Sequence, residues 1–171
     1  MIQAKFLGSN IVTETSNEAR DLYNKNRFGI IKRDKVILSL FEAFYLLEKG
    51  RIDISGGNRK LSEDAFVKKA KKQLKNFPIK YSVFRDLRDR GYVVKTALKF
   101  GAEFRVYDKG INPGQDHAKW IVYPVHESET MTWHDFSAKN RVAHSTKKRL
   151  LIGIVDDEED VTYYEIAWKR P

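Results

Sequence analysis

The feature that most constrains the fold is a continuous apolar segment close to the C-terminal end of the sequence. Residues 150–155 are leucine, isoleucine or valine at every position except Gly153. A strand with one solvated face alternates apolar and polar residues, whereas a strand covered on both faces is apolar throughout. We therefore expect residues 149–155 to form a strand that is buried on both faces of a sheet.

Helix signals precede this segment. Ser39 and Glu42 have the spacing of a capping box and are followed by an apolar run, which predicts a helix start. Ser62 is followed by two acids, which favour the N-terminal end of a helix. The expected helices span residues 40–49, 63–76, 79–90 and 134–146, and the expected strands span residues 2–6, 51–54, 92–95, 98–107, 117–125, 149–155 and 161–168.

Phe77-Pro78 ends the second expected helix, and strand patterns dominate after Gly91. Helices and strands mixed in this order predict an α/β (α+β) chain of two domains. We expect a small N-terminal mixed α/β domain at residues 1–78. A C-terminal α/β domain with a central mixed sheet is expected at residues 79–171.

Composition excludes several classes of function. The chain has no cysteine, which excludes disulfides, thiolate metal sites and a cysteine nucleophile. Its four histidines form no HxH or HxxxH pair, so no histidine-rich metal site is expected, whereas Mg²⁺ held by carboxylates stays open. The sequence shows no transmembrane run and no signal-peptide core, so we expect a soluble, cytoplasmic protein without a membrane partner.

The charge balance favours a polyanionic partner. Lysine and arginine total 32 against 23 acids, a net charge of +9. Such an excess suits phosphate contacts, but charge alone does not separate RNA from DNA, an anionic membrane or simple solubility. The expected helix 63–76 contains five lysines, and the sequence leaves open whether they are solvated or touch nucleic acid.

Three residue types suggest a chemistry. In the expected strand 98–107, Tyr107 shares a polar face with Glu103 and Arg105. His117 follows a Pro-Gly turn at the start of the next strand, and Lys148 immediately precedes the buried strand. RNA can be cleaved without a metal when a base activates the 2′-hydroxyl, an acid protonates the leaving oxygen and a cation stabilises the phosphorane. These residues fit those roles, but as common residue types they do not establish them.

Longer motifs resemble a known family. Residues 90–107 read RGYVVKTALKFGAEFRVY, which resembles the "RGYxVKTGxKFGxDFRxY" stretch of the archaeal tRNA-splicing endonucleases. Residues 141–156 resemble that family's "RVAHSxxKKLLIAIVD", and residues 38–46 resemble its "LSLxEAxYL". Ala97 stands where the family has glycine, and Gly153 where it has alanine.

The resemblance implies an enzyme that excises introns from precursor tRNA at bulge–helix–bulge motifs. It assigns Tyr107 as general base, His117 as general acid and Lys148 as phosphorane stabiliser, with no cofactor and no metal. It leaves His144 a structural role. The cleavage products would be a 2′,3′-cyclic phosphate and a 5′-hydroxyl. RNA binding is expected at Arg141 and at Trp168, the second by its place in the last strand. It is also expected at Lys147 and Arg149 of the basic stretch, which consists of Lys139, Arg141, Lys147, Lys148 and Arg149.

The family also assembles from four subunits, with an acidic loop of one entering a basic cleft of another. Asp156, Asp157, Glu158, Glu159 and Asp160 occupy that loop's position. The expected partners are therefore precursor tRNA and further copies of the chain, or a related subunit. The alternatives are a non-catalytic structural or RNA-binding subunit, a general RNA-binding module and a Mg²⁺-dependent DNA nuclease.

Overall fold

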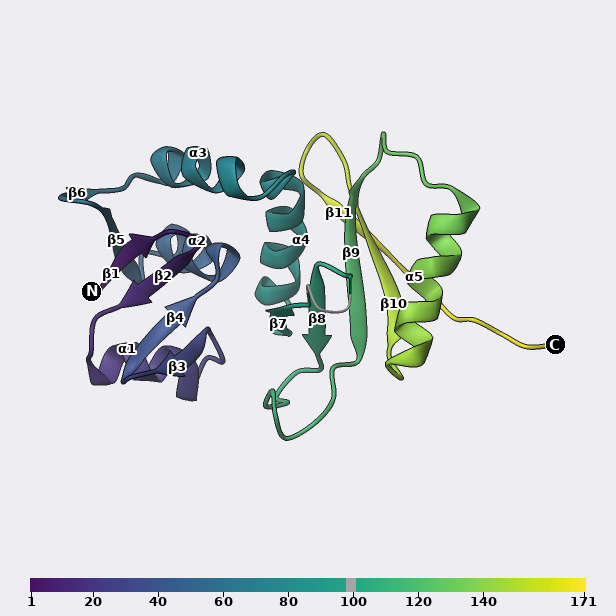
Figure 1. Cartoon of the computed structure of the whole chain (residues 1–171), viewed down its shortest axis with the longest axis horizontal. Helices are drawn as coiled ribbons and strands as arrows, with labels where there is room; N and C mark the ends of the chain where they lie inside the picture. Colours follow the sequence, from purple (N-terminus) through teal and green to yellow (C-terminus); the bar gives the residue numbers. More distant parts are fainter. Residues whose placement is uncertain (98–100) are drawn as a thin grey trace. The chain divides into compact units, whose positions relative to one another are not determined.

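The computed structural model describes residues 1–97 and 101–171 (Figure 1). By internal contacts the chain divides into two compact units, residues 1–78 and 79–171. Each unit contains helices and one mixed sheet, which confirms the α/β (α+β) class expected from the sequence. Within the described ranges, no helix has the length and apolar character needed to cross a membrane.

The first unit is built on a six-stranded sheet. Its strand order is β3-β4-β2-β1-β5-β6; β1 pairs with β5 in parallel and the other pairs are antiparallel. The elements are β1 (Ile2–Leu7), β2 (Asn10–Thr13), α1 (Asn17–Asn24), β3 (Ile30–Lys32), β4 (Lys35–Leu38), α2 (Leu40–Glu48), β5 (Ile52–Gly56), β6 (Arg59–Lys60) and α3 (Glu63–Gln73).

Helix α2 begins where the capping box predicts. The Glu42 backbone N–H donates to Ser39 Oγ at 3.3 Å, and the Ser39 backbone N–H donates to Glu42 Oε2 at 3.0 Å. Phe44 of α2 stacks on Phe66 of α3, and Phe41 stacks on Phe77, each with ring centroids 5.3 Å apart. Burial of each ring contributes roughly 1.5–3 kcal/mol, so these rings anchor the core of the first unit.

Two parts of this unit differ from the sequence prediction. Helix α1 and the strands between residues 10 and 38 were not predicted, because each is too short to show a clear period. The helix expected over 63–76 ends at Gln73, and α4 (Phe77–Asp89) begins before Pro78 instead of after it. Proline fits there because a residue in the first helical turn needs no N–H for the helix.

The second unit is built on a five-stranded mixed sheet in the order β11-β10-β9-β8-β7. Strands β9 and β10 pair in parallel, and the other pairs are antiparallel. The elements of this unit are the remainder of α4, then β7 (Val93–Thr96), β8 (Phe104–Tyr107), β9 (Trp120–His126), α5 (Trp133–Ser145), β10 (Arg149–Val155) and β11 (Val161–Ile166).

Helices cover both faces of this sheet, as Figure 1 shows for α4 and α5. Ala143 of α5 lies in the core cluster with Leu150 and Ile152 of β10. On the opposite face, Phe84 of α4 packs against Phe104 of β8 with ring centroids 5.8 Å apart. Strand β10 is consequently buried on both faces, which confirms the prediction from its unbroken apolar run.

Three strand limits in this unit differ from the prediction. Strand β8 starts at Phe104 instead of residue 98; residues 101–103 form a turn, and residues 98–100 lie outside the described residues. Strand β9 starts at Trp120, so His117 precedes the strand instead of opening it. Strand β11 ends at Ile166, which leaves Trp168 beyond the strand in which it was expected.

The two departures from the family motif both fit this unit. A Cβ at Gly153 would lie 3.0 Å from Val83 Cγ2 of α4, so glycine lets that helix approach the sheet closely. Ala97 is buried and has no left-handed backbone angle, so this position does not require glycine.

Candidate active site

Three chain segments meet at one edge of the five-stranded sheet. Val106 of β8 pairs with Trp120, and the Lys119 N–H donates to the Val106 carbonyl at 2.8 Å. Arg149 of β10 also pairs with Trp120, and its N–H donates to the Lys119 carbonyl at 3.0 Å. Continuing both registers by one residue places Lys119 between Tyr107 and Lys148. Neighbouring strands lie about 4.8 Å apart, so the Tyr107 and Lys148 backbones are about 10 Å apart.

Tyr107 is more buried than the sequence predicted. Strand alternation put it on a polar face, yet its side chain is 5% exposed and packs with Val93 and Ala118. Ile111, from the segment before β9, packs against the same cluster. The Arg105 guanidinium carbon lies 6.0 Å from the centre of the Tyr107 ring. The tyrosine is therefore held by packing and has a cation beside it.

His117 lies in the segment that leads into β9. It is exposed, and its backbone N–H donates to Asp116 Oδ1 at 2.7 Å. Ala118, the next residue, packs against Tyr107. The imidazole therefore starts from a backbone position directly beside the tyrosine cluster, although it lies outside the strand.

Lys148 is positioned by the end of α5. The Lys148 N–H donates to the Ala143 carbonyl at 2.9 Å and the Lys147 N–H to the His144 carbonyl at 3.0 Å, the two bonds of a Schellman motif. Lys147 takes the left-handed conformation, with φ 55°, that glycine usually supplies in this motif. The Lys148 ammonium donates to the Thr146 carbonyl at 3.0 Å, and the side chain is half-buried. The chain reversal therefore fixes the base of the Lys148 side chain.

Glu165 ties the neighbouring strands together and was not identified from the sequence. Its carboxylate accepts from Trp120 Nε1 and from an Arg149 NH group, both at 2.7 Å. Hydrogen bonding by Trp120, and then by Arg149, lowers the pKa of Glu165 below its usual value. One N–H group of Arg149, an expected RNA-binding residue, is thus engaged within the sheet. An acid in an alternating strand predicts a solvated side chain, so no sequence signal distinguished Glu165.

Arg141 and Trp168, both expected to bind RNA, line one groove with a volume of about 660 Å³. Trp168 is 56% exposed and packs edge-to-face on His144, with ring centroids 4.5 Å apart. His144, expected to be structural, is exposed and lines this groove. The lining combines apolar, polar and cationic residues: Phe136, Ser137, Asn140, Arg141, His144, Ser145, Ile166, Ala167, Trp168 and Lys169.

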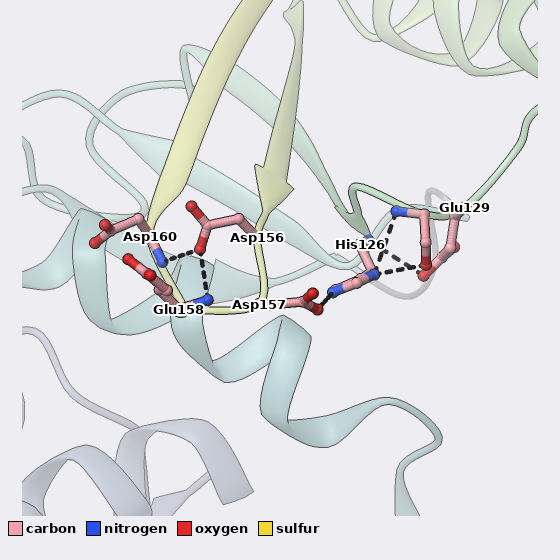
Figure 2. A network of polar contacts seen from close by, with 7 residues as sticks. His126, Glu129, Asp156, Asp157, Glu158 and Asp160 are labelled. Atoms are coloured by element: carbon pink, nitrogen blue, oxygen red, sulfur yellow. Dashed lines mark hydrogen bonds and ion pairs between the residues drawn. The ribbon is translucent and has the colours of Figure 1, made fainter.

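The acidic segment 156–160 is the turn between β10 and β11 (Figure 2). Asp156 Oδ1 accepts the backbone N–H groups of Glu158 and Asp160, each at 2.9 Å. Asp157 lies 3.0 Å from His126 Nε2, and its side chain is 86% exposed. Asp156 therefore shapes the turn, while Asp157 and Glu158 present negative charge at the surface. In the part of the chain that the structure describes, no group of three or more His, Asp or Glu side chains could hold a metal ion.

Comparison with known proteins covers both units. Residues 77–163 match the model of the tRNA intron endonuclease catalytic C-terminal domain, and residues 2–67 match that of the N-terminal domain. The tRNA-splicing endonuclease of Thermococcus gammatolerans is 40% identical over 99% of both chains. That of Methanothermobacter thermautotrophicus is 42% identical over 96% of both, and that of Nanoarchaeum equitans is 46% identical over 78% of this chain and 90% of its own.

These matches extend over nearly the whole sequence and include the catalytic domain, which confirms the resemblance seen in the sequence motifs. The chain belongs to the tRNA intron endonuclease family.

Proposed function

We propose that this protein is a metal-independent endoribonuclease that excises introns from precursor tRNA at bulge–helix–bulge motifs. The observation that carries the proposal is that the backbone positions of Tyr107, His117 and Lys148 lie near one another at one edge of the five-stranded sheet. The chain also matches the catalytic domain of this family. Tyrosine, histidine and lysine suffice for cleavage by the RNA's own 2′-hydroxyl.

The proposed reaction is an internal transfer at one phosphate. Tyr107 removes the 2′-hydroxyl proton, and the resulting oxygen attacks the adjacent phosphorus. The bond from phosphorus to the 5′-oxygen breaks, and His117 gives that oxygen a proton. Lys148 offsets the negative charge of the phosphorane. The products are a 2′,3′-cyclic phosphate and a 5′-hydroxyl. The Arg105 guanidinium carbon lies 6.0 Å from the centre of the Tyr107 ring, so a second cation borders the proposed site.

The substrate requirement is tested with two RNAs of similar length. One is a precursor tRNA whose intron is flanked by a bulge–helix–bulge, and the other has the same region fully base-paired. The full chain should cut the first at both bulges and leave the second intact, because only unstacked bases leave the phosphate free to align. Equal cutting of both RNAs, or of neither by folded protein, contradicts the proposed substrate.

We further propose that the groove lined by Arg141 and Trp168 holds a base of the bulge. Trp168→Ala should weaken binding of the bulged RNA about 5- to 150-fold, which corresponds to the roughly 1–3 kcal/mol of one stacked base. Binding of the fully paired RNA should change little. Tyr23→Ala removes a partly exposed ring from helix α1 of the first unit and is the control. The base-stacking role is wrong if both variants bind the bulged RNA equally well. Lys147 and Arg149 are proposed to contact phosphates next to this groove.

Assembly is proposed to proceed through the acidic turn, in a homotetramer or in a heterotetramer with a related subunit. The double variant Asp157→Asn, Glu158→Gln removes exposed charge while Asp156 still holds the turn. Light scattering of the wild type should give about 80 kDa, four chains of 20.0 kDa, and the variant should give smaller species. The control variant Glu14→Gln, Glu18→Gln should keep the wild-type mass. If the Asp157→Asn, Glu158→Gln variant also keeps the wild-type mass, the acidic turn has no role in assembly.

A further inference from the structure

The positive charge of the chain is concentrated outside the unit that carries the candidate active site. Residues 1–78 contain 16 lysines and arginines against 9 acids, a net charge of +7. Residues 79–171 contain 16 against 14, a net charge of +2. A polyanionic substrate is attracted most strongly by the more positive surface. The first unit is therefore the better candidate for additional RNA contacts.

Helix α3 concentrates much of this charge on one side. Phe66 and Ala70 face the core and are fully buried. Lys68, Lys71 and Lys72 are exposed and fall on the opposite side, at the spacing of residues that share a helix face. Lys75, just past the end of the helix, is also exposed. We call Lys68, Lys71 and Lys72 the lysine face of α3.

These lysines differ from Arg20, Lys25 and Lys60 of the same unit, which lie close to acidic side chains. Lys25 lies 2.7 Å from Asp21, Lys60 pairs with Asp53, and Arg20 lies near Asp34. Over residues 1–97 and 101–171, by contrast, no ion pair involves the lysine face. Its charge is therefore available to an external anion.

The helix dipole accounts for only part of this pattern. Lys71 and Lys72 lie in the last turn of α3, where cations stabilise the dipole. Lys68 lies near the middle of the helix, and Lys75 lies outside it, so neither is explained in this way. The residue types of the lysine face also indicate which part of RNA it could contact. The face presents flexible lysine ammonium groups, and it contains neither an arginine nor an aromatic ring. Such a surface suits phosphates and is poorly suited to reading bases.

We propose that the lysine face of α3 is a second RNA-binding surface that contacts the phosphate backbone of precursor tRNA independently of base sequence. This inference rests on the proposed function, since that function supplies the RNA. The lysine face adds affinity for the body of the substrate, whereas the groove at Trp168 is proposed to hold a single base. The contacts are electrostatic, so they weaken as salt rises.

The test uses the full chain and full-length precursor tRNA, titrated between about 50 and 200 mM salt, the range over which phosphate contacts change most visibly. The variant is Lys68→Gln, Lys71→Gln, Lys72→Gln. The control Lys25→Gln, Lys49→Gln, Lys60→Gln removes the same charge from the same unit. The lysine-face variant should bind roughly 10- to 100-fold more weakly than the control at low salt. The slope of the logarithm of its binding constant against the logarithm of the salt concentration should be smaller in magnitude by about two to three. Its cleavage rate at saturating RNA should be unchanged.

RNA affinity, its salt dependence and the mass of the assembly distinguish an RNA-binding surface from a contact between chains. Affinity and salt slope equal to those of the control overturn the inference. Light scattering on the same variants tests the other candidate partner, an acidic turn of a second copy. Dissociation of the assembly in the lysine-face variant overturns the inference, because it identifies the face as a contact between chains. Weaker RNA binding by an intact assembly supports it. If the wild type binds through this face but cuts no RNA, the proposed function fails and the binding surface stands.

Discussion

Replacement of His117 by alanine is expected to slow single-turnover cleavage of precursor tRNA by about 10²- to 10⁴-fold near neutral pH. That range is the usual contribution of a positioned general acid, whose loss leaves the 5′-oxygen to depart unprotonated. Because His117 is exposed and lies outside β9, its side chain contributes little to the fold. RNA affinity and thermal stability should therefore remain close to those of the wild type.

His134→Ala is the matched control, since His134 is also exposed but lies in the first turn of α5. It should cleave at the wild-type rate. Added imidazole should restore part of the activity of the His117 variant, because the missing proton donor can be supplied from solution. A wild-type single-turnover rate in the His117 variant removes this residue from the reaction.

Lys148→Ala is expected to reduce the single-turnover rate by about 10²- to 10³-fold while leaving RNA binding within a few fold. Removing one preorganised group that stabilises transition-state charge typically has an effect of this size. The backbone bonds that end α5 involve no side-chain atom of Lys148, so the turn should persist in the variant. Rates are measured at saturating RNA, with circular dichroism to establish folding.

Lys139→Ala provides the comparison for Lys148. Lys139 belongs to the same basic stretch, but its ammonium lies 4.5 Å from the centre of the Tyr123 ring on the body of the sheet. Its loss should change the rate little. If Lys139→Ala and Lys148→Ala reduce the rate equally, general positive charge explains the effect and Lys148 has no special role.

Much of the fold was predictable because its signals are local. The unbroken apolar run at residues 150–155 predicts a strand that is buried on both faces, and the structure places α4 and α5 on its two sides. The capping box at Ser39 likewise locates the start of α2. Elements of three or four residues such as β3 and β4 lack such a signal, since a short segment shows neither period clearly.

The environment of the candidate site was less predictable because it depends on contacts between distant segments. Alternation assigned Tyr107 to a polar face, but Ala118 and Ile111 fold back and bury its ring. Glu165 acquires its partners only when β9, β10 and β11 align. Arg141 and Trp168 come together because the chain leaves β11 alongside α5. The family motifs selected Tyr107 and Arg141, whereas the partners of these residues emerge only from the fold.

End-group analysis of RNA cut in the presence of excess EDTA tests the proposed metal-independent mechanism directly. The full chain is incubated with a bulge–helix–bulge precursor tRNA, and the new ends are identified by enzymatic treatment. Cleavage by Tyr107, His117 and Lys148 predicts undiminished activity, a 2′,3′-cyclic phosphate on one side of each cut and a 5′-hydroxyl on the other. Loss of cleavage in EDTA that is restored by Mg²⁺, or products with a 5′-phosphate, would contradict it.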